Sequence, residues 1–249
     1  MGLVAKLKCG FYYEQLTIDQ KCIYKAIAAA VSGYLPSVTV EAADTKALHK
    51  IMMAVEYDNP EFFYWAPENS KINGNTILLS YTTGEKREAV EAVRMLREKR
   101  RSILQDLFEM YSDMNQKEAL YSLYDYLVKN VTYAADELQK PACAQWIYDI
   151  EGPLLKGKGV CLGIAQTVNY LCASLHIKSL LITGECRVAG WNGNHGWNLV
   201  EMDGQYYHLD VTCDLNNAAG QEGRYEYFML KDRDMEERKW PRNLYPKAV

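Results

Sequence analysis

Residues Gly157–Asp214 read GKGVCLGIAQTVNYLCASLHIKSLLITGECRVAGWNGNHGWNLVEMDGQYYHLDVTCD, and they carry the strongest signals in the chain. After Cys161 the apolar residues recur at helical spacing, so this residue is predicted to open a helix. Its sulfur would lie near unpaired backbone N–H groups and the positive end of the helix dipole, which favour a thiolate. A buried core cysteine is the alternative interpretation. The apolar series is Ile164, Ala165, Val168, Leu171, Cys172 and Leu175.

Two runs that alternate in polarity follow, at residues 195–202 and 205–211. Asp203-Gly204 separates them, and this dipeptide between such runs is a strong signal for a β-hairpin. His195 lies on one face of the first predicted strand and Asp210 on one face of the second. Pairing the strands can bring the Asp210 carboxylate close to the His195 ring. The Gly/Asn-rich segment 190–194 is predicted to be a loop before the hairpin.

Cys161, His195 and Asp210 therefore follow one another in an order that an enzyme with a thiol nucleophile can use. Each has a structural explanation when taken alone. The histidine could be a packed, hydrogen-bonded side chain, and the aspartate could be a solvated carboxylate at a strand end. The ordered combination of all three favours a catalytic triad.

The same residues resemble the transglutaminase-like superfamily, which is related to the papain-like cysteine peptidases. The spacings of 34 residues (195−161) and 15 residues (210−195) are short, as in its compact bacterial members. Segment 124–133 resembles a helix that such proteins carry before the nucleophile. The motifs are G-V-C-x-G-x-A at Gly159–Ala165, H-G-W-N at His195–Asn198 and Y-H-L-D-V-T at Tyr207–Thr212.

The resemblance implies an α+β fold in which the nucleophile helix packs on an antiparallel sheet. It also implies that Cys161 is the nucleophile, His195 the general base and acid, and Asp210 the residue that orients the histidine. The expected activity is that of a cysteine peptidase or amidase on a peptide or protein substrate, with no cofactor and no metal. An amine in place of water would make the enzyme a transglutaminase.

Two other classes stay open. A binding or scaffold protein could keep this fold without turnover, since a fold does not fix a function. A metal site could use Cys161, His195, His208 and Asp210, although local zinc-ligand spacings are absent. We otherwise interpret His208 as a strand histidine that packs near the site rather than a catalytic group.

Composition narrows the possible partners. The 249 residues are 49% hydrophobic and 24% charged, and the net charge of −4 argues against a nucleic-acid partner. Seven cysteines without a C-x-x-C pair argue against a disulfide framework and favour a reducing compartment. The first residues show no signal peptide, and the longest apolar run is too short to span a bilayer. A cytoplasmic protein without a membrane partner is expected; the sequence does not predict its oligomeric state.

The rest of the chain is predicted to be an N-terminal, mostly helical region, residues 1–115, before a catalytic domain, residues 116–249. Thr17 to Gln20 reads as a capping box before one helix, and Asp44 or Thr45 caps a second. A strand is predicted at 76–81 and a long helix at 84–114. A helix covers 117–131, and the boundary falls in the polar turn 112–116.

Overall fold

The computed structural model divides the chain into two compact units, residues 1–97 and 98–249. Its described residues are 9–41, 43–110, 114–188, 191–215 and 225–249. A long helix, α4 (Lys86–Met110), runs across the division. The expected boundary in the turn 112–116 lies partly outside the described residues, because 112 and 113 are not among them. That boundary stays a prediction.

Helices of the first unit begin where capping side chains are predicted. Before α2 (Ile18–Gly33), the Thr17 hydroxyl accepts from the Gln20 amide, and the Gln20 side chain accepts from the Thr17 amide. Before α3 (Thr45–Asp58), the Asp44 carboxylate accepts from the Ala47 amide at 2.8 Å. Such caps satisfy amides that a helix leaves without internal acceptors. Both predicted helix starts are confirmed.

A small antiparallel sheet with the order β1-β3-β2 completes this unit. The strand predicted at 76–81 is shorter than expected and ends at Leu78. Beyond it, Trp65 and Tyr81 form only an isolated bridge, and no strand among the described residues continues the ladder there. The remaining elements of the unit are α1 (Phe11–Glu14), β1 (Ser37–Thr39), β2 (Lys71–Asn73), β3 (Thr76–Leu78) and the 3-10 turns Pro60–Phe62 and Pro67–Asn69.

The second unit is built on a five-stranded sheet with the order β10-β6-β7-β8-β9, and every neighbouring pair is antiparallel. Together with the helices of both units, this sheet confirms the predicted α+β fold. Its strands are β6 (Ser179–Val188), β7 (Trp191–Met202), β8 (Gln205–Leu209), β9 (Phe228–Leu230) and β10 (Arg238–Lys239).

The predicted hairpin joins β7 to β8. Asp203 and Gly204 both have positive φ, 52° and 73°, as a tight two-residue hairpin turn requires. Two details of the prediction are wrong. The expected loop 190–194 is strand from Trp191 onward, because β6 supplies backbone partners for it, while residue 190 lies outside the described residues. The second strand ends at Leu209, and not at Val211, because α8 (Val211–Leu215) begins there.

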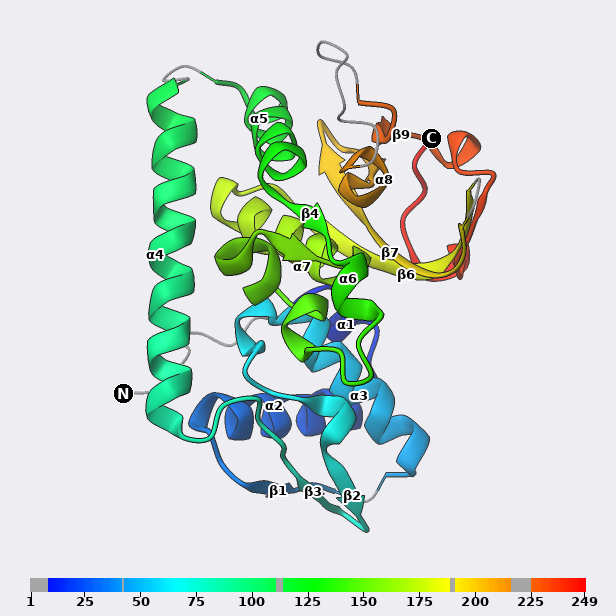
Figure 1. Ribbon diagram of the computed structural model, residues 1–249. Helices are drawn as coiled ribbons and strands as arrows, with labels where there is room; N and C mark the ends of the chain where they lie inside the picture. Colours follow the sequence, from blue (N-terminus) through cyan, green and yellow to red (C-terminus); the bar gives the residue numbers. More distant parts are fainter. Residues whose placement is uncertain (1–8, 42, 111–113, 189–190, 216–224) are drawn as a thin grey trace. The chain divides into compact units, whose positions relative to one another are not determined.

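Helix α7 (Cys161–Cys172) packs against β6 and β7, as Figure 1 shows. The expected packing of this helix on an antiparallel sheet is confirmed. Helix α5 (Gln116–Asn130) precedes it and is capped by Asn115, close to the predicted range of 117–131. The connecting segment contains β4 (Thr132–Tyr133), α6 (Ala135–Leu138), the 3-10 turn Gln145–Tyr148, the π-helical turn Gly152–Lys156 and β5 (Lys158–Gly159); further 3-10 turns lie at Ala173–Leu175, Asp232–Asp234 and Arg242–Leu244.

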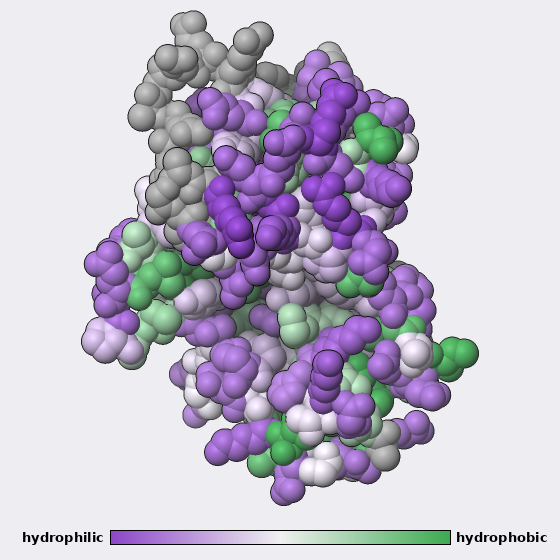
Figure 2. Space-filling view, turned by 90° about the vertical axis from the view of Figure 1, so that its right-hand side faces the viewer, coloured by the Kyte–Doolittle hydropathy of each residue, from purple (hydrophilic) through white to green (hydrophobic). Residues whose placement is uncertain are grey.

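On the face shown in Figure 2, hydrophilic side chains predominate and hydrophobic ones form small groups between them. Such scattered apolar exposure is ordinary for a folded protein surface. Within the described ranges, no helix combines the length and the apolar character needed to cross a bilayer.

Close packing around the start of α7 leads to a stability prediction. A Cβ atom at Gly163 would lie 2.6 Å from the Ile147 carbonyl oxygen and 2.8 Å from that of Asp149. Gly163→Ala should therefore lower the free energy of unfolding by about 1–3 kcal/mol, although alanine is usually the better helix former. Thermal unfolding followed by circular dichroism measures this change.

The matched control is Gly84→Ala, where the new Cβ would meet only a flexible Glu88 carboxylate oxygen at 3.5 Å. We expect that variant to unfold within a degree or two of the wild type. Equal unfolding temperatures for Gly163→Ala and the wild type would contradict the packing described here.

Candidate active site

Cys161 is the first residue of α7, as predicted, and its side chain is partly exposed. Two glycines allow the start of this helix to lie close to its neighbours. At Gly163 the helix packs against the backbone of Ile147, and at Gly196 strand β7 approaches Leu162, whose Cα would lie 3.4 Å from an added Cβ. Because Gly196 directly follows His195, the same close approach brings the histidine to the start of α7.

Asn198 fixes the helix to the strand. Its side-chain amide donates to the Ala165 carbonyl and to the Asn169 side chain, both at 2.9 Å. Asn198 is almost fully buried, so these hydrogen bonds satisfy donors that water cannot reach. The asparagine of the H-G-W-N motif thus has a structural role: it holds α7 and β7 in register near Cys161.

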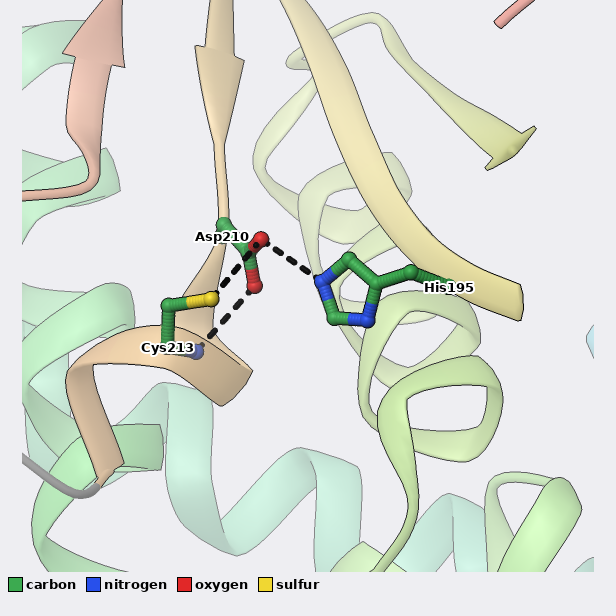
Figure 3. Close-up of side chains that lie close together, drawn as sticks. All are labelled: His195, Asp210 and Cys213. Carbon is green, nitrogen blue, oxygen red and sulfur yellow. Dashed lines mark hydrogen bonds and ion pairs between the residues drawn. The ribbon is translucent and has the colours of Figure 1, made fainter. Parts of the chain in front are cut away.

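His195 lies between Cys161 and Asp210. Its Nε2 atom is 2.7 Å from the Asp210 Oδ2 atom, and both side chains are buried (Figure 3). The Cys161 thiol also lies close to the ring, since it contributes to the raised pKa of His195. Burial alone would lower the pKa of His195, but the Asp210 carboxylate and Cys161 outweigh it and raise the pKa to about 10. The three residues that the sequence singles out therefore meet at one place.

Asp210 accepts more hydrogen bonds than the sequence indicates. Its Oδ1 atom accepts from the Cys213 amide at 3.2 Å, which caps the start of α8. Its Oδ2 atom also accepts from the Cys213 thiol at 3.3 Å and from the Arg238 guanidinium at 2.7 Å. Burial would raise the pKa of Asp210, but His195 and Arg238 hold it well below its usual range. Asp210 is therefore ionised across the neutral range.

Sequence reasoning missed Cys213 and Arg238. The cap could have been found, because Asp210 stands three residues before Cys213, the usual spacing between an N-cap and the amide it binds. Arg238 offers no such signal. It belongs to β10, a two-residue strand that no hydrophobic pattern marks, and it reaches Asp210 only because β10 pairs with β6.

His208 does not join this group. Its Nδ1 atom accepts from the Trp197 indole at 3.0 Å, and its Nε2 atom lies 2.8 Å from the Asp232 carboxylate. Burial lowers the pKa of His208. The structure thus supports the sequence-based view that His208 packs in the sheet.

A metal site receives little support from this geometry. The ligand atoms of His195, Asp210 and Cys213 lie within 4.8 Å of one another, a group that differs from the one suggested by the sequence. However, one guanidinium nitrogen of Arg238 donates to both the Asp210 carboxylate and the Cys213 sulfur, at 2.7 and 3.0 Å. These hydrogen bonds occupy lone pairs that a metal ion would need. The positive charge of Arg238 would also repel a metal cation.

Comparison with known proteins adds a family. Residues 105–211 match the model of the transglutaminase-like superfamily. Among solved structures, the chain is similar to a TGase, with 14% identity and a TM-score of 0.44 over 86% of this chain and 52% of that one. It is also similar to a putative cysteine protease from Cytophaga hutchinsonii, with 16% identity and a TM-score of 0.36 over 45% of this chain and 37% of that one. No curated protein gives a significant match.

The chain spans about half or less of the length of these two solved proteins. The family match has a clearer meaning, because its limits enclose α7, the β7–β8 hairpin and all of Cys161, His195 and Asp210. Residues 105–211 of this chain therefore form a core domain of the transglutaminase-like superfamily.

Proposed function

We propose that this protein is a thiol-dependent acyl-transfer enzyme that cleaves amide bonds through Cys161, His195 and Asp210. One observation carries the proposal: the His195 ring has the Cys161 thiol on one side and the ionised Asp210 carboxylate on the other. This is the arrangement in which a base activates a nucleophile while a third group orients the base.

The reaction begins from an ion pair in which the thiol proton already resides on His195, so that Cys161 is a thiolate beside an imidazolium. The Cys161 thiolate then attacks the amide carbonyl and forms a tetrahedral intermediate. Its oxyanion can accept from the Cys161 backbone N–H, one of the first amides of α7, which have no acceptor within the helix. The His195 imidazolium next protonates the leaving amine, and a thioester on Cys161 results. Water, activated by neutral His195, releases the acyl group as a carboxylic acid.

Peptides and proteins are the proposed substrates. Three partly buried aromatic side chains, Tyr133, Trp146 and Tyr148, pack against the core cluster that includes Val160, the residue before Cys161. Tyr133 lies on β4 beside Gly159, two residues before the nucleophile. Apolar ring faces next to hydroxyl groups suit a polypeptide, which offers apolar side chains and backbone hydrogen-bonding groups together.

A first prediction concerns reactivity. Iodoacetamide at pH about 6 should alkylate Cys161 before the exposed Cys9, Cys22 and Cys143, because ordinary thiols are almost fully protonated there. Peptide mapping by mass spectrometry gives the order. In the matched variant His195→Gln, Cys161 should be alkylated no faster than the three exposed cysteines. Faster modification of the three exposed cysteines in the native protein would contradict the proposed ion pair.

A second prediction concerns the acyl acceptor. A mixture of casein peptides, incubated with the protein and a fluorescent primary amine, should yield shortened or deamidated products with little amine label. Labelled peptides would instead show transglutaminase activity. Cys161→Ser should lower the rate at which both kinds of product form by about a thousandfold or more. Cys22→Ser, which removes an exposed thiol outside the proposed triad, should leave them unchanged.

If the native protein forms no product from any peptide and Cys161 shows no special reactivity, the chain is better described as a binding or scaffold protein.

A third prediction concerns the proton on His195. Because its pKa is raised to about 10, the imidazolium should persist well above neutral pH and be lost only as the pH rises through that value. Asp210→Asn removes the carboxylate charge and should lower this pKa by two units or more, roughly. Titration of the four histidines by NMR measures the shift, with His195→Gln to assign the signal.

His208→Gln is the control for this titration, since the hydrogen bonds of His208 go to Trp197 and Asp232. The His195 signal should titrate as in the wild type. An ordinary His195 pKa near 6.5 in the wild-type protein would contradict the charge arrangement described above.

A further inference from the structure

Arg238 is a buried cation behind the candidate triad. It is 3% exposed and lies on β10, opposite Cys186 of β6. Its Nη2 atom donates at 2.7 Å to the same Asp210 oxygen that meets His195. Burying a guanidinium costs free energy unless an anion and further acceptors compensate it. Asp210 is the anion that does so here.

Arg238 is not held by an optimal set of hydrogen bonds. Its Nη2 atom also donates to the Cys213 sulfur at 3.0 Å, and the guanidinium lies 4.8 Å from the centre of the Tyr227 ring. Its Nε atom is buried and has no hydrogen-bond partner among the described residues. A residue kept only to fill space or to make hydrogen bonds would be poorly suited to this position. The property of Arg238 that this site uses most fully is its positive charge.

We propose that Arg238 is a positioning residue that sets the number of protons held by Cys161, His195 and Asp210. This inference rests on the proposed function, because it concerns the same thiol. A buried cluster is most stable when its charges sum to zero. With the positive charge of Arg238 present, the sum is zero when Cys161, His195 and Asp210 together carry a charge of −1. They do so when they hold one titratable proton between them. This is the state in which Cys161 can be a thiolate beside an imidazolium.

Without Arg238, the neutral cluster would hold two protons. Asp210 would be ionised, His195 would be an imidazolium, and Cys161 would keep its proton. In that state neither a thiolate nor a free base exists, so the enzyme cannot begin the reaction. Arg238 thus removes one proton from the resting site without touching the substrate or the reacting atoms.

Other titratable groups face Arg238, and their protonation contributes to the total charge around it. Cys213 remains a thiol, since the neighbouring Cys186 and burial raise its pKa, while Cys213 lowers the pKa of Cys186 to about 7. Burial lowers the pKa of His208 against the opposing effect of the Asp232 carboxylate, and Arg238 lowers it further. Around the guanidinium the facing groups are Asp210 on the turn after β8, Cys213 on α8, Cys186 on β6, His195 on β7, His208 on β8 and Tyr227 before β9.

The test is the pH profile of Cys161 alkylation by iodoacetamide, read at that residue by mass spectrometry. Arg238→Met removes the charge and keeps an unbranched side chain, and it should move the midpoint upward by about one pH unit or more. Arg238→Lys restores a positive charge and should recover at least half of that shift. A role in packing alone would lower the unfolding temperature of Arg238→Met and leave the midpoint in place, and that result would overturn the proposal.

Two further variants keep the test decisive if Arg238→Met does not fold. Asp210→Asn leaves Arg238 without its anion and should move the midpoint downward. Asp210→Asn/Arg238→Met removes both charges, which folded proteins often tolerate, and should return the midpoint toward the wild type. A double variant that keeps the full shift of Asp210→Asn would overturn the proposal. Repeating the series with Cys186→Ser shows whether titration of Cys186 contributes.

The outcomes separate this inference from the proposed function. If Cys161 of the wild type reacts no faster than the exposed cysteines, the proposed enzyme activity fails and the inference fails with it. If Cys161 reacts first in the wild type and its midpoint is the same in Arg238→Met, the activity stands and the role of Arg238 is refuted.

Discussion

The Asp210 carboxylate is the point at which the second unit is held together. It accepts from His195 on β7, from Arg238 on β10, and from both the amide and the thiol of Cys213 on α8. These donors come from three elements that are separated along the chain. A buried carboxylate requires such partners, since leaving it without them would cost several kcal/mol, roughly. The need to satisfy one anion therefore ties the edge strand, the central strand and a helix start to one another.

Local structure also determines why this carboxylate lies beside His195. Strand β8 ends at Leu209, because the next residue, Asp210, caps α8 with its side chain. The Asp203-Gly204 turn places β8 beside β7. Register along the β7–β8 pair then determines which β7 side chains face Asp210. A slip of one residue would turn His195 to the other face of the sheet. The tight turn, the cap and the position of the histidine therefore form one constraint.

Much of the second unit could be predicted because its signals are local. The helical spacing after Cys161, the Asp-Gly turn and the alternation through His195 and Asp210 each depend on neighbouring residues, and all three appear in the structure. What the sequence did not show depends on contacts between distant segments. Residues 191–194 look like a loop by composition, but β6 makes them a strand. Arg238 stands 28 residues after Asp210, and only the pairing of β10 with β6 brings the two together.

Burial of this cluster separates its electrostatics from the surrounding medium. The side chains of His195, Asp210 and Arg238 are only 2–3% exposed, so dissolved ions cannot come between them. Ion pairs at the surface, such as Lys178 with Glu201, are open to counterions and weaken once the Debye length falls below about 8 Å. Added salt therefore acts on the outside of the protein and leaves the charges around Asp210 almost unscreened. The ion pairs that Asp210 makes with His195 and Arg238 therefore depend only weakly on the ionic strength of the surroundings.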